Sequence, residues 1–297
     1  MLDIVAISNL KAGRNSRGFL AEIEGVLPYR SHIVAPSRES YPAVMQEVVE
    51  RDPDIMMIIG GDTTGSDVFT AGLNQYSLDQ IPPVVLVNGG TVGMHGVAVG
   101  HSRNHPLQTI EETLALDHVD VVERNLVKVD YGGQTRFGLS FSNGIVTNFF
   151  ERYDQTPGEL AAKALVARGI AGFLGREVFK TAYREIFEEF PMTLEFPDET
   201  ITRDMHWVFV YAMPVGLVDA FKFPHEKDLH VLAGSFDRKL MIKMIKEGIL
   251  GQNLSAPINR SASQLIINGG SFILDGETVK YGGPVTLSPQ KVRYVKL

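Results

Sequence analysis

The sequence contains no cysteine among its 297 residues. This absence excludes disulfide bonds, thiolate nucleophiles and zinc sites with cysteine ligands. Basic residues are also in deficit, because 28 lysines and arginines against 35 acids give a formal net charge of −7. A nucleic-acid-binding protein usually carries a basic surface, so we expect no nucleic-acid partner. The same acidity argues against permanent attachment to an anionic membrane.

Long apolar runs are missing as well. The longest candidate, residues 160–174, is interrupted by Lys163 and Arg168, whereas a membrane-spanning helix needs roughly 18 apolar residues. The amino terminus shows no basic region followed by an apolar one and a cleavage site. We therefore expect a cytoplasmic protein whose contact with a membrane surface is peripheral and transient.

The most informative segment that is present is the apolar run 55–59, which ends in Gly-Gly-Asp-Thr-Thr at 60–64. A run of this length is typical of a buried parallel strand. Glycines at its end let the backbone approach a bound phosphate closely. Asp62 would then stand where an acid can hold a metal ion or accept a proton. An ordinary Gly-Gly-Asp turn is the alternative interpretation.

Two further apolar runs end in the same way. Residues 84–87 lead into Asn-Gly-Gly-Thr-Val-Gly at 88–93, and residues 4–7 lead into a polar segment that contains Lys11 and Arg14. The carboxyl ends of parallel strands meet at one edge of the sheet, where open α/β folds bind ligands. The three segments therefore predict a phosphate-bearing nucleotide at that edge.

The pattern changes near residue 122. Up to that point, expected strands alternate with expected helices at 17–27, 41–51, 67–73 and 107–116, which predicts an α/β domain built on an open parallel sheet. Residues 123–297 contain short β-rich runs separated by turn residues, which predicts an antiparallel, sandwich-like domain with a helical insert at 158–190. A hydrophobic content of 44% can fill two such cores.

Four segments, taken in order, carry a resemblance to a known family. They are Asn-Leu-Lys-Ala-Gly at 9–13, the Gly-Gly-Asp-Thr-Thr segment, Gly90-Thr91, and Asp-Gly-Glu at 275–277. Together they resemble the motifs of the diacylglycerol kinase catalytic superfamily, which includes lipid and sphingosine kinases and is distantly related to NAD kinases. The resemblance covers nearly the whole chain. It implies that the tail, about 285–297, returns to the first domain.

The resemblance also implies an activity and a site. The expected activity is transfer of the γ-phosphate of ATP, with Mg²⁺, to a hydroxyl of a lipid such as diacylglycerol. Asp275 is the expected general base, and Asp62 organises the magnesium. Glu277 is expected to support the metal or the ribose, although Asp-Gly-Glu after an apolar strand can also be a plain β-turn. The expected nucleotide-binding residues are Asn9, Lys11, Arg14, Gly60, Gly61, Thr64, Gly90, Thr91 and Glu277. A homodimer is also expected, although no motif argues for it.

The sequence departs from the family pattern at five positions. Thr63 replaces a glycine, Asp67 replaces a glutamate, and Asn88, Gly93 and Met94 replace a proline, an asparagine and an aspartate. A β-branched residue such as threonine disfavours a positive φ. These departures keep two alternatives open, a catalytically impaired member of the same fold that senses nucleotide or lipid, and a soluble kinase of the NAD kinase type.

Three histidines, His95, His101 and His105, lie close together in the sequence. Their spacing does not match a helical metal site, and the sequence favours solvated loop histidines. Gly-x-Ser-x-Gly and the dinucleotide-binding glycine pattern are both absent, which disfavours a serine hydrolase and a dinucleotide-binding dehydrogenase.

Overall fold

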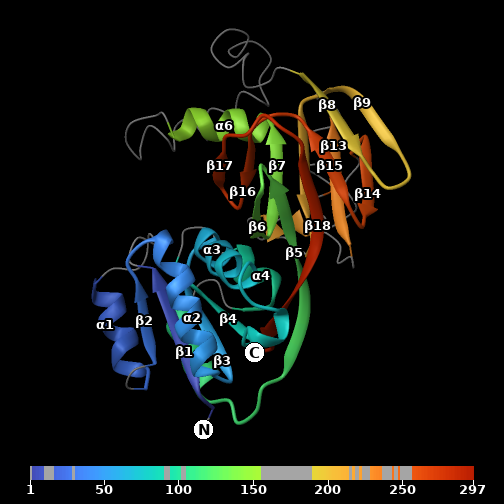
Figure 1. Ribbon diagram of the computed structural model, residues 1–297. Coiled ribbons are helices and arrows are strands. Elements are labelled where there is room, and N and C mark those ends of the chain that lie inside the picture. Colours follow the sequence, from blue (N-terminus) through green and yellow to red (C-terminus); the bar gives the residue numbers. More distant parts are fainter. Residues whose placement is uncertain are drawn as a thin grey trace.

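The computed structural model describes residues 2–9, 17–28, 31–89, 94–101, 105–154, 189–213, 216–217, 221–222, 228–235, 243, 247 and 256–297. Two lobes are visible, joined by two long strands (Figure 1). We call β1 to α5 the first lobe and β6 to β17 the second lobe. The joining strands, β5 (Val121–Tyr131) and β18 (Val285–Val295), run through both lobes.

The first lobe is an α/β layer structure. Its strands are β1 (Ile4–Asn9), β2 (His32–Ala35), β3 (Ile55–Gly60) and β4 (Val84–Asn88), and they pair in parallel in the order β2-β1-β3-β4. Its helices are α1 (Arg17–Val26), α2 (Tyr41–Arg51), α3 (Asp62–Leu73), α4 (Met94–Ala98) and α5 (Pro106–Leu114), with short 3₁₀ turns η1 (Arg38–Ser40) and η2 (Leu78–Gln80). Strands β3 and β4 are buried on both faces, as continuous apolar runs require.

The second lobe is a sandwich of antiparallel strands. One layer continues the first sheet through β18, which pairs with β5 and with β15 (Leu265–Asn268), and extends to β6 (Gln134–Gly138), β8 (Phe190–Glu195) and β9 (Thr200–Met205). The other layer has the order β14-β13-β10-β7-β16-β17. Its strands are β14 (Ile258–Ala262), β13 (Leu229–Gly234), β10 (Trp207–Tyr211), β7 (Ser140–Gly144), β16 (Phe272–Leu274) and β17 (Glu277–Val279). The short strands β11 (Gly216–Leu217) and β12 (Phe221–Lys222) pair antiparallel as a separate two-stranded sheet.

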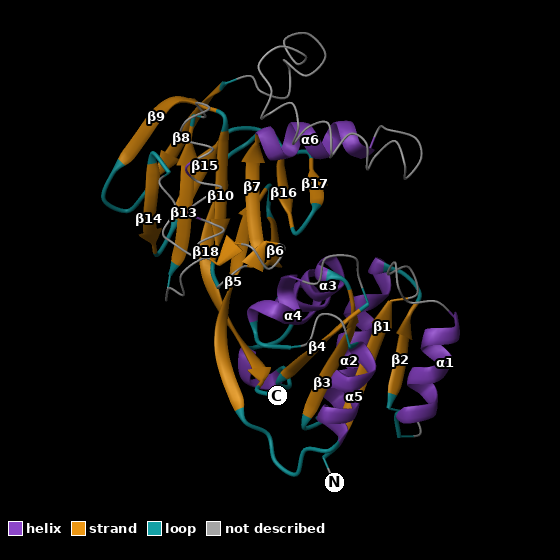
Figure 2. Cartoon of the chain, turned by 180° about the vertical axis from the view of Figure 1, so that it is seen from behind, coloured by secondary structure: helices purple, strands orange, loops and turns teal. Residues whose placement is uncertain are grey.

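The predicted fold class is confirmed, an α/β lobe followed by an antiparallel sandwich. Strand β18 passes from the sandwich into the first lobe, where Tyr294 pairs in parallel with Val84. Strand β5 crosses residue 122, where the sequence placed a domain boundary. The predicted helical insert at 158–190 lies outside the described residues except for 189 and 190, and Phe190 begins β8. Helix α6 (Ile145–Asp154), which the sequence did not predict, lies across the end of the sandwich far from the first lobe (Figure 2).

The two lobes share an apolar core. One buried cluster joins Val68 and Phe69 of α3 to Leu126 of the joining strand β5 and to Phe137 and other residues of the second lobe. A second cluster fills the sandwich, and a third covers the other face of the parallel sheet. Because apolar burial is the main stabilising contribution to a fold, the shared cluster holds the lobes together. Within the described part of the chain, no helix is both long and apolar enough to span a bilayer.

Candidate functional site

The junction between β3 and α3 forms the centre of the site. Gly60 ends the strand, Gly61 is the N-cap of the helix, and Asp62 is the first helical residue. A Cβ on Gly60 would lie 2.5 Å from the Thr64 hydroxyl oxygen, so only glycine lets the helix start this close to the strand. The first-turn N–H groups and the helix dipole make such an end favourable for an anion. The sequence predicted α3 from residue 67, but the helix begins at Asp62.

The Asp62 carboxylate is held by main chain from another segment. Its Oδ1 accepts a hydrogen bond of 2.8 Å from the main-chain N of His95 in α4. Gly60, Gly61, Asp62, Asn88 and His95 are among the residues that line a cavity of about 10 Å³, which is about the size of one water molecule. Asp62 is only half-buried, so its carboxylate remains accessible to a ligand at the end of the sheet.

Thr64 connects this junction to the first strand. The Asn9 amide donates to the Thr64 hydroxyl over 3.3 Å, which brings two predicted nucleotide-binding residues together. Tyr41 at the start of α2 lies beside them, and burial raises the pKa of its hydroxyl to about 12. The predicted residues Lys11, Arg14, Gly90 and Thr91 lie outside the described residues.

Thr63, which replaces a glycine of the family pattern, occupies a helical position in α3. Only Asp52 and Asp275 are non-glycine residues with positive φ among the described residues, so Thr63 needs no left-handed conformation. Its hydroxyl donates to the main-chain carbonyl of Asp275 over 3.3 Å. Threonine here therefore contacts the second lobe.

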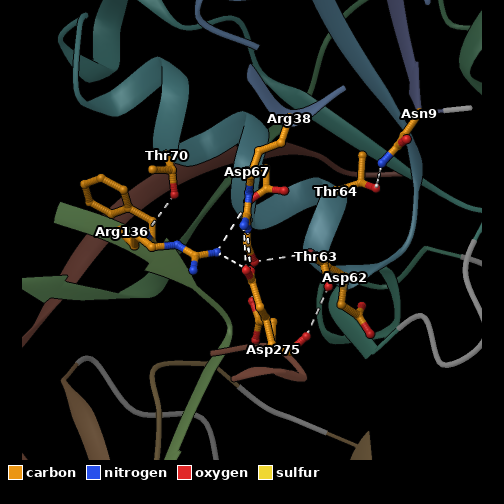
Figure 3. A network of polar contacts seen from close by, with 12 residues as sticks. Asn9, Arg38, Asp62, Thr63, Thr64, Asp67, Thr70, Arg136 and Asp275 are labelled. Carbon is orange, nitrogen blue, oxygen red and sulfur yellow. Dashed lines mark hydrogen bonds and ion pairs between the residues drawn. The ribbon is translucent and has the colours of Figure 1, made fainter. Parts of the chain in front are cut away.

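Asp275 comes from the turn between β16 and β17 and is 6% exposed. Its carboxylate accepts hydrogen bonds of 2.8 Å from the main-chain N of Leu139 and of Ser140, and a third from the Ser66 hydroxyl in α3. Figure 3 shows Asp275 approaching the first turn of α3. Burial raises the pKa of Asp275 to about 6 despite these bonds, and the negative charge of Asp62 adds to the rise. A carboxylate in this state is ionised at neutral pH and basic enough to accept a proton.

Glu277 belongs to an ion-pair cluster that spans both lobes. We define the inter-lobe cluster as Arg38 of η1, Asp67 of α3, Arg136 of β6 and Glu277 of β17. Arg38 binds Glu277 at 2.5 Å and Asp67 at 2.8 Å, while Arg136 binds Glu277 at 2.7 Å and Asp67 at 3.4 Å. No motif in the sequence indicated a role for either arginine. Arg38 follows β2 at the ligand-binding edge of the sheet, which is the one signal that could have identified it.

The two acids of the inter-lobe cluster respond differently to their surroundings. Burial raises the pKa of Asp67, and its two arginine neighbours only partly offset that effect. Burial also acts to raise the pKa of Glu277, but hydrogen bonds from Arg38 and Arg136 outweigh it and hold the pKa below the ordinary value. The two pKa values shift in opposite directions because Asp67 is the more buried acid: its side chain is 10% exposed, and that of Glu277 is 31% exposed.

A larger groove of about 650 Å³ adjoins the inter-lobe cluster. Its lining residues come from three segments: the start of α2 with the preceding Arg38, α3 with the two residues that follow it, and the β5–β6 hairpin. Asp67 lies about one and a half helical turns after the first residue of α3. The groove therefore begins next to the anion-favouring end of that helix.

The prediction that the three histidines are solvated loop residues is wrong for two of them. His95 is fully buried, and its Nε2 lies 2.8 Å from the Tyr294 hydroxyl. His101 is also buried and links the main chain of Leu86 to that of Val295. Burial lowers the pKa of both, that of His95 to about 3, so both are neutral. His105 alone is exposed.

A magnesium site is compatible with these residues in a limited way. No group of three or more histidine, aspartate or glutamate side chains that could hold a metal ion occurs within the described ranges. Magnesium in phosphoryl-transfer sites usually takes one or two carboxylates and completes its shell with phosphate oxygens and water. Asp62, half-buried beside the α3 amino end, fits such a role. Glu277 could contribute only if its two arginines moved away.

Comparison with known proteins supports the architecture. No protein-family model matches the sequence. No curated protein matches it either. Three solved structures from Bacillus anthracis str. Sterne are similar over almost the whole chain. The chain has the fold of the diacylglycerol kinases.

Two of these structures are named as a candidate diacylglycerol kinase. One is 15% identical, with a TM-score of 0.70 over 99% of this chain and 97% of that chain. The second is 17% identical, with a TM-score of 0.66 over 98% and 97%. The third, named as a diacylglycerol kinase, is 14% identical, with a TM-score of 0.67 over 99% and 97%. At these identities the likeness to diacylglycerol kinases establishes the fold, and function has to be argued from the site.

Proposed function

We propose that this protein is an ATP-dependent lipid kinase that transfers the γ-phosphate to a hydroxyl of a lipid such as diacylglycerol. One observation carries the proposal, the Gly60-Gly61-Asp62 junction at the ligand-binding edge of a parallel sheet with Asp275 of the second lobe beside it. Phosphoryl transfer needs donors for the phosphates, a carboxylate for magnesium and a positioned acid. The fold is compatible with that assignment.

The nucleotide is assigned to the first lobe and the adjoining groove. The phosphates would bind at the amino end of α3, with Asn9 and Thr64 beside them. The nucleoside would occupy the 650 Å³ groove that begins at Asp67 and Tyr41. Magnesium, when bound, offsets phosphate charge, and Asp62 is the proposed ligand. Lys11, Arg14, Gly90 and Thr91, which lie outside the described residues, remain proposed contributors on sequence grounds alone.

Asp275 is the proposed general base. Its raised pKa places it close to neutral pH, and a serine hydroxyl, that of Ser66, already donates to its carboxylate. An acceptor hydroxyl arriving from the lipid would make the same kind of bond and give up its proton to the same oxygen. The acceptor would come from a membrane surface during a transient contact.

A nucleotide-binding sensor without transferase activity is the second candidate. The observation that favours it is that the carboxylates of Asp275 and Glu277 already accept hydrogen bonds from donors within the protein. A sensor needs the nucleotide site but has no use for a base with an open coordination position. Binding of ATP without transfer to any acceptor would identify this function.

Incubation with γ-labelled ATP and Mg²⁺ tests the proposal directly. The acceptor panel is diacylglycerol, monoacylglycerol, sphingosine and NAD, the last to detect a kinase of the NAD kinase type. We expect label on a lipid and none on NAD. Label on NAD alone would overturn the lipid assignment, and ATP binding without any transfer would favour the sensor.

A further inference from the structure

The imidazole ring of His95 is buried against the joining strand β18. His95 is 2% exposed, and its Nε2 lies 2.8 Å from the hydroxyl of Tyr294, which is itself fully buried. The rings of Phe69 and Tyr294 pack around the imidazole and hold it in place. Nδ1, the other ring nitrogen, has no hydrogen-bond partner within the part of the chain that the structure describes. A buried polar atom left in this state is unfavourable, so Nδ1 calls for a partner.

The small cavity at the junction between β3 and α3 lies beside Nδ1. Its lining includes Gly65 and His95, together with Gly60, Gly61 and Asp62. A Cβ on Gly65 would lie 3.0 Å from His95 Nδ1, so the missing side chain of Gly65 leaves the space next to this nitrogen. Glycine inside a helix lowers stability relative to alanine. Helix α3 therefore has a helix-weakening residue at a position where alanine would close the space beside Nδ1.

The hydrogens of the His95–Tyr294 pair have one favourable arrangement. The ring is neutral and carries one N–H, because burial lowers the pKa of His95 to about 3. If the proton were on Nε2, the Tyr294 hydroxyl would accept it, and the hydroxyl's own proton would have no acceptor among the described residues. If the proton is on Nδ1, the Tyr294 hydroxyl donates to Nε2. The second arrangement leaves a single group, Nδ1–H, without a protein partner, and that group faces the cavity.

We propose that this cavity is the binding site of one ordered water molecule that accepts a hydrogen bond from His95 Nδ1–H. Its volume of about 10 Å³ matches one water, and a buried water needs two to four polar partners. Asp62 and Asn88, which also line the cavity, have side-chain oxygens that can accept the hydrogens of the water. A chain of hydrogen bonds then runs from Tyr294 of β18 through the imidazole and the water to the ligand-binding edge of the sheet. The inference does not depend on the proposed function.

Nuclear magnetic resonance of the full chain labelled with ¹⁵N-histidine tests the direction of this chain. We expect a one-bond ¹H–¹⁵N coupling at Nδ1 of His95 and none at Nε2. The Nδ1 proton should also show cross-relaxation with water. A crystal structure at high resolution should place an ordered water about 2.7–3.2 Å from Nδ1.

Matched variants separate the water from general features of the fold. Gly65→Ala puts a methyl group into the space beside Nδ1 and should abolish both the ordered water and the cross-relaxation. Gly25→Ala, with no heavy atom within 4 Å of the added Cβ, should leave both unchanged. At position 95, asparagine has an amide close to the Nδ1 position and glutamine has one close to the Nε2 position. The water should therefore persist in His95→Asn and be lost in His95→Gln, a comparison that stands should Gly65→Ala fail to fold.

Three results would overturn the proposal. One is a wild type with its proton on Nε2, and another is a high-resolution structure with no water within hydrogen-bond distance of Nδ1. The third is retention of the water in either Gly65→Ala or His95→Gln, which would show that Nδ1 and the space beside it do not hold the water. None of these measurements requires catalysis. A protein that holds the water but transfers no phosphate would refute only the proposed function.

Discussion

The two lobes present their acids at the site in opposite ways. Asp62 of the first lobe is half-buried, and a main-chain N–H from α4 orients it. Asp275 of the second lobe is buried, and main chain and hydroxyl donors surround it. The first arrangement suits an acid that binds something from solution. The second suits an acid whose position and proton affinity are set by the protein.

The proposed function gives the two lobes separate tasks that match this difference. The first lobe provides the features of an anion and metal site, which are helix N–H groups, close backbone approach and an accessible carboxylate. The second lobe provides an acid with a pKa near 6 and carries it to the first turn of α3 through Thr63 and Ser66. Each task can be removed separately, which makes the comparison testable.

The largest expected effect is on turnover in Asp275→Asn. A base acts mainly in the transition state, so turnover should fall by roughly 10²- to 10⁴-fold while ATP affinity stays within a few-fold. Asp62→Asn should instead change the Mg²⁺ dependence, because it alters the proposed metal ligand. Steady-state kinetics over a range of Mg²⁺ concentrations measures both. Full activity in Asp275→Asn would reduce the Asp-Gly-Glu segment to a structural turn.

The second effect is a pH dependence of stability. The pKa of Asp275 is about 6 in the folded protein, against an ordinary value of 3.8. The stability that this shift contributes is therefore fully present below pH 3.8 and is lost as the pH rises to about 6. The pKa of His95 is lowered from 6.5 to about 3, so its contribution is lost as pH falls below 6.5. Between pH 4 and pH 6, a rise in pH therefore reduces the stability contributed by Asp275 and increases that contributed by His95.

Asp275→Asn removes one side of that balance. As the pH falls from 6 to 4, the wild type gains the contribution of Asp275 and the variant does not. The free energy of unfolding of the variant should therefore fall relative to that of the wild type by up to about 3 kcal/mol, from a shift of about two pKa units. Urea denaturation of both proteins at several pH values measures the difference. Parallel stability curves would show that the Asp275 pKa is close to ordinary.

Gly60→Ala should destabilise the first lobe at its anion-binding junction. The added Cβ would fall 2.5 to 2.6 Å from three Thr64 side-chain atoms, including its Cβ. Overpacking of this kind typically costs about 1–3 kcal/mol. Gly25 of α1 has no heavy atom within 4 Å of an added Cβ, so Gly25→Ala is the matched control. Equal stability of the two variants in chemical denaturation would contradict the close packing of α3 on β3.

The smallest expected effect concerns Thr63, a link between the lobes. Thr63→Gly removes a hydroxyl bonded to Asp275 and weakens the first turn of α3, for a loss of about 1 kcal/mol. Thr63→Ser keeps the hydroxyl and should retain most of the stability. Thermal unfolding compares the two. A glycine variant that is equally stable and binds ATP more tightly would mean that the side chain obstructs the nucleotide.

The sequence predicted what depends on local pattern. The run 55–59 and the glycines that follow it indicated both a buried strand and a ligand-binding end, because length, hydrophobicity and turn residues all lie within one segment. The start of α3 was placed five residues late, since Asp, Thr, Thr and Gly at 62–65 are weak helix formers. An acid in the first turn nevertheless stabilises a helix through its dipole.

Features that depend on distant partners could not be predicted in this way. His95 bonds to Tyr294, which is 199 positions away, so nothing in its own neighbourhood shows that it is buried. Arg38 and Glu277 are 239 positions apart, and Arg136 lies 141 positions from the same acid. The inter-lobe cluster forms where residues from both lobes meet in the fold, and no local pattern in the sequence shows that meeting.

A single-turnover transfer experiment tests the central claim most directly. Excess protein is mixed with limiting γ-labelled ATP, Mg²⁺ and vesicles that contain diacylglycerol, and lipid and inorganic phosphate are counted separately. The account predicts label on the lipid in the wild type, one product for each ATP consumed, with transfer slowed strongly in Asp62→Asn and Asp275→Asn. Label that remains on ATP or appears only as inorganic phosphate in the wild type would contradict it.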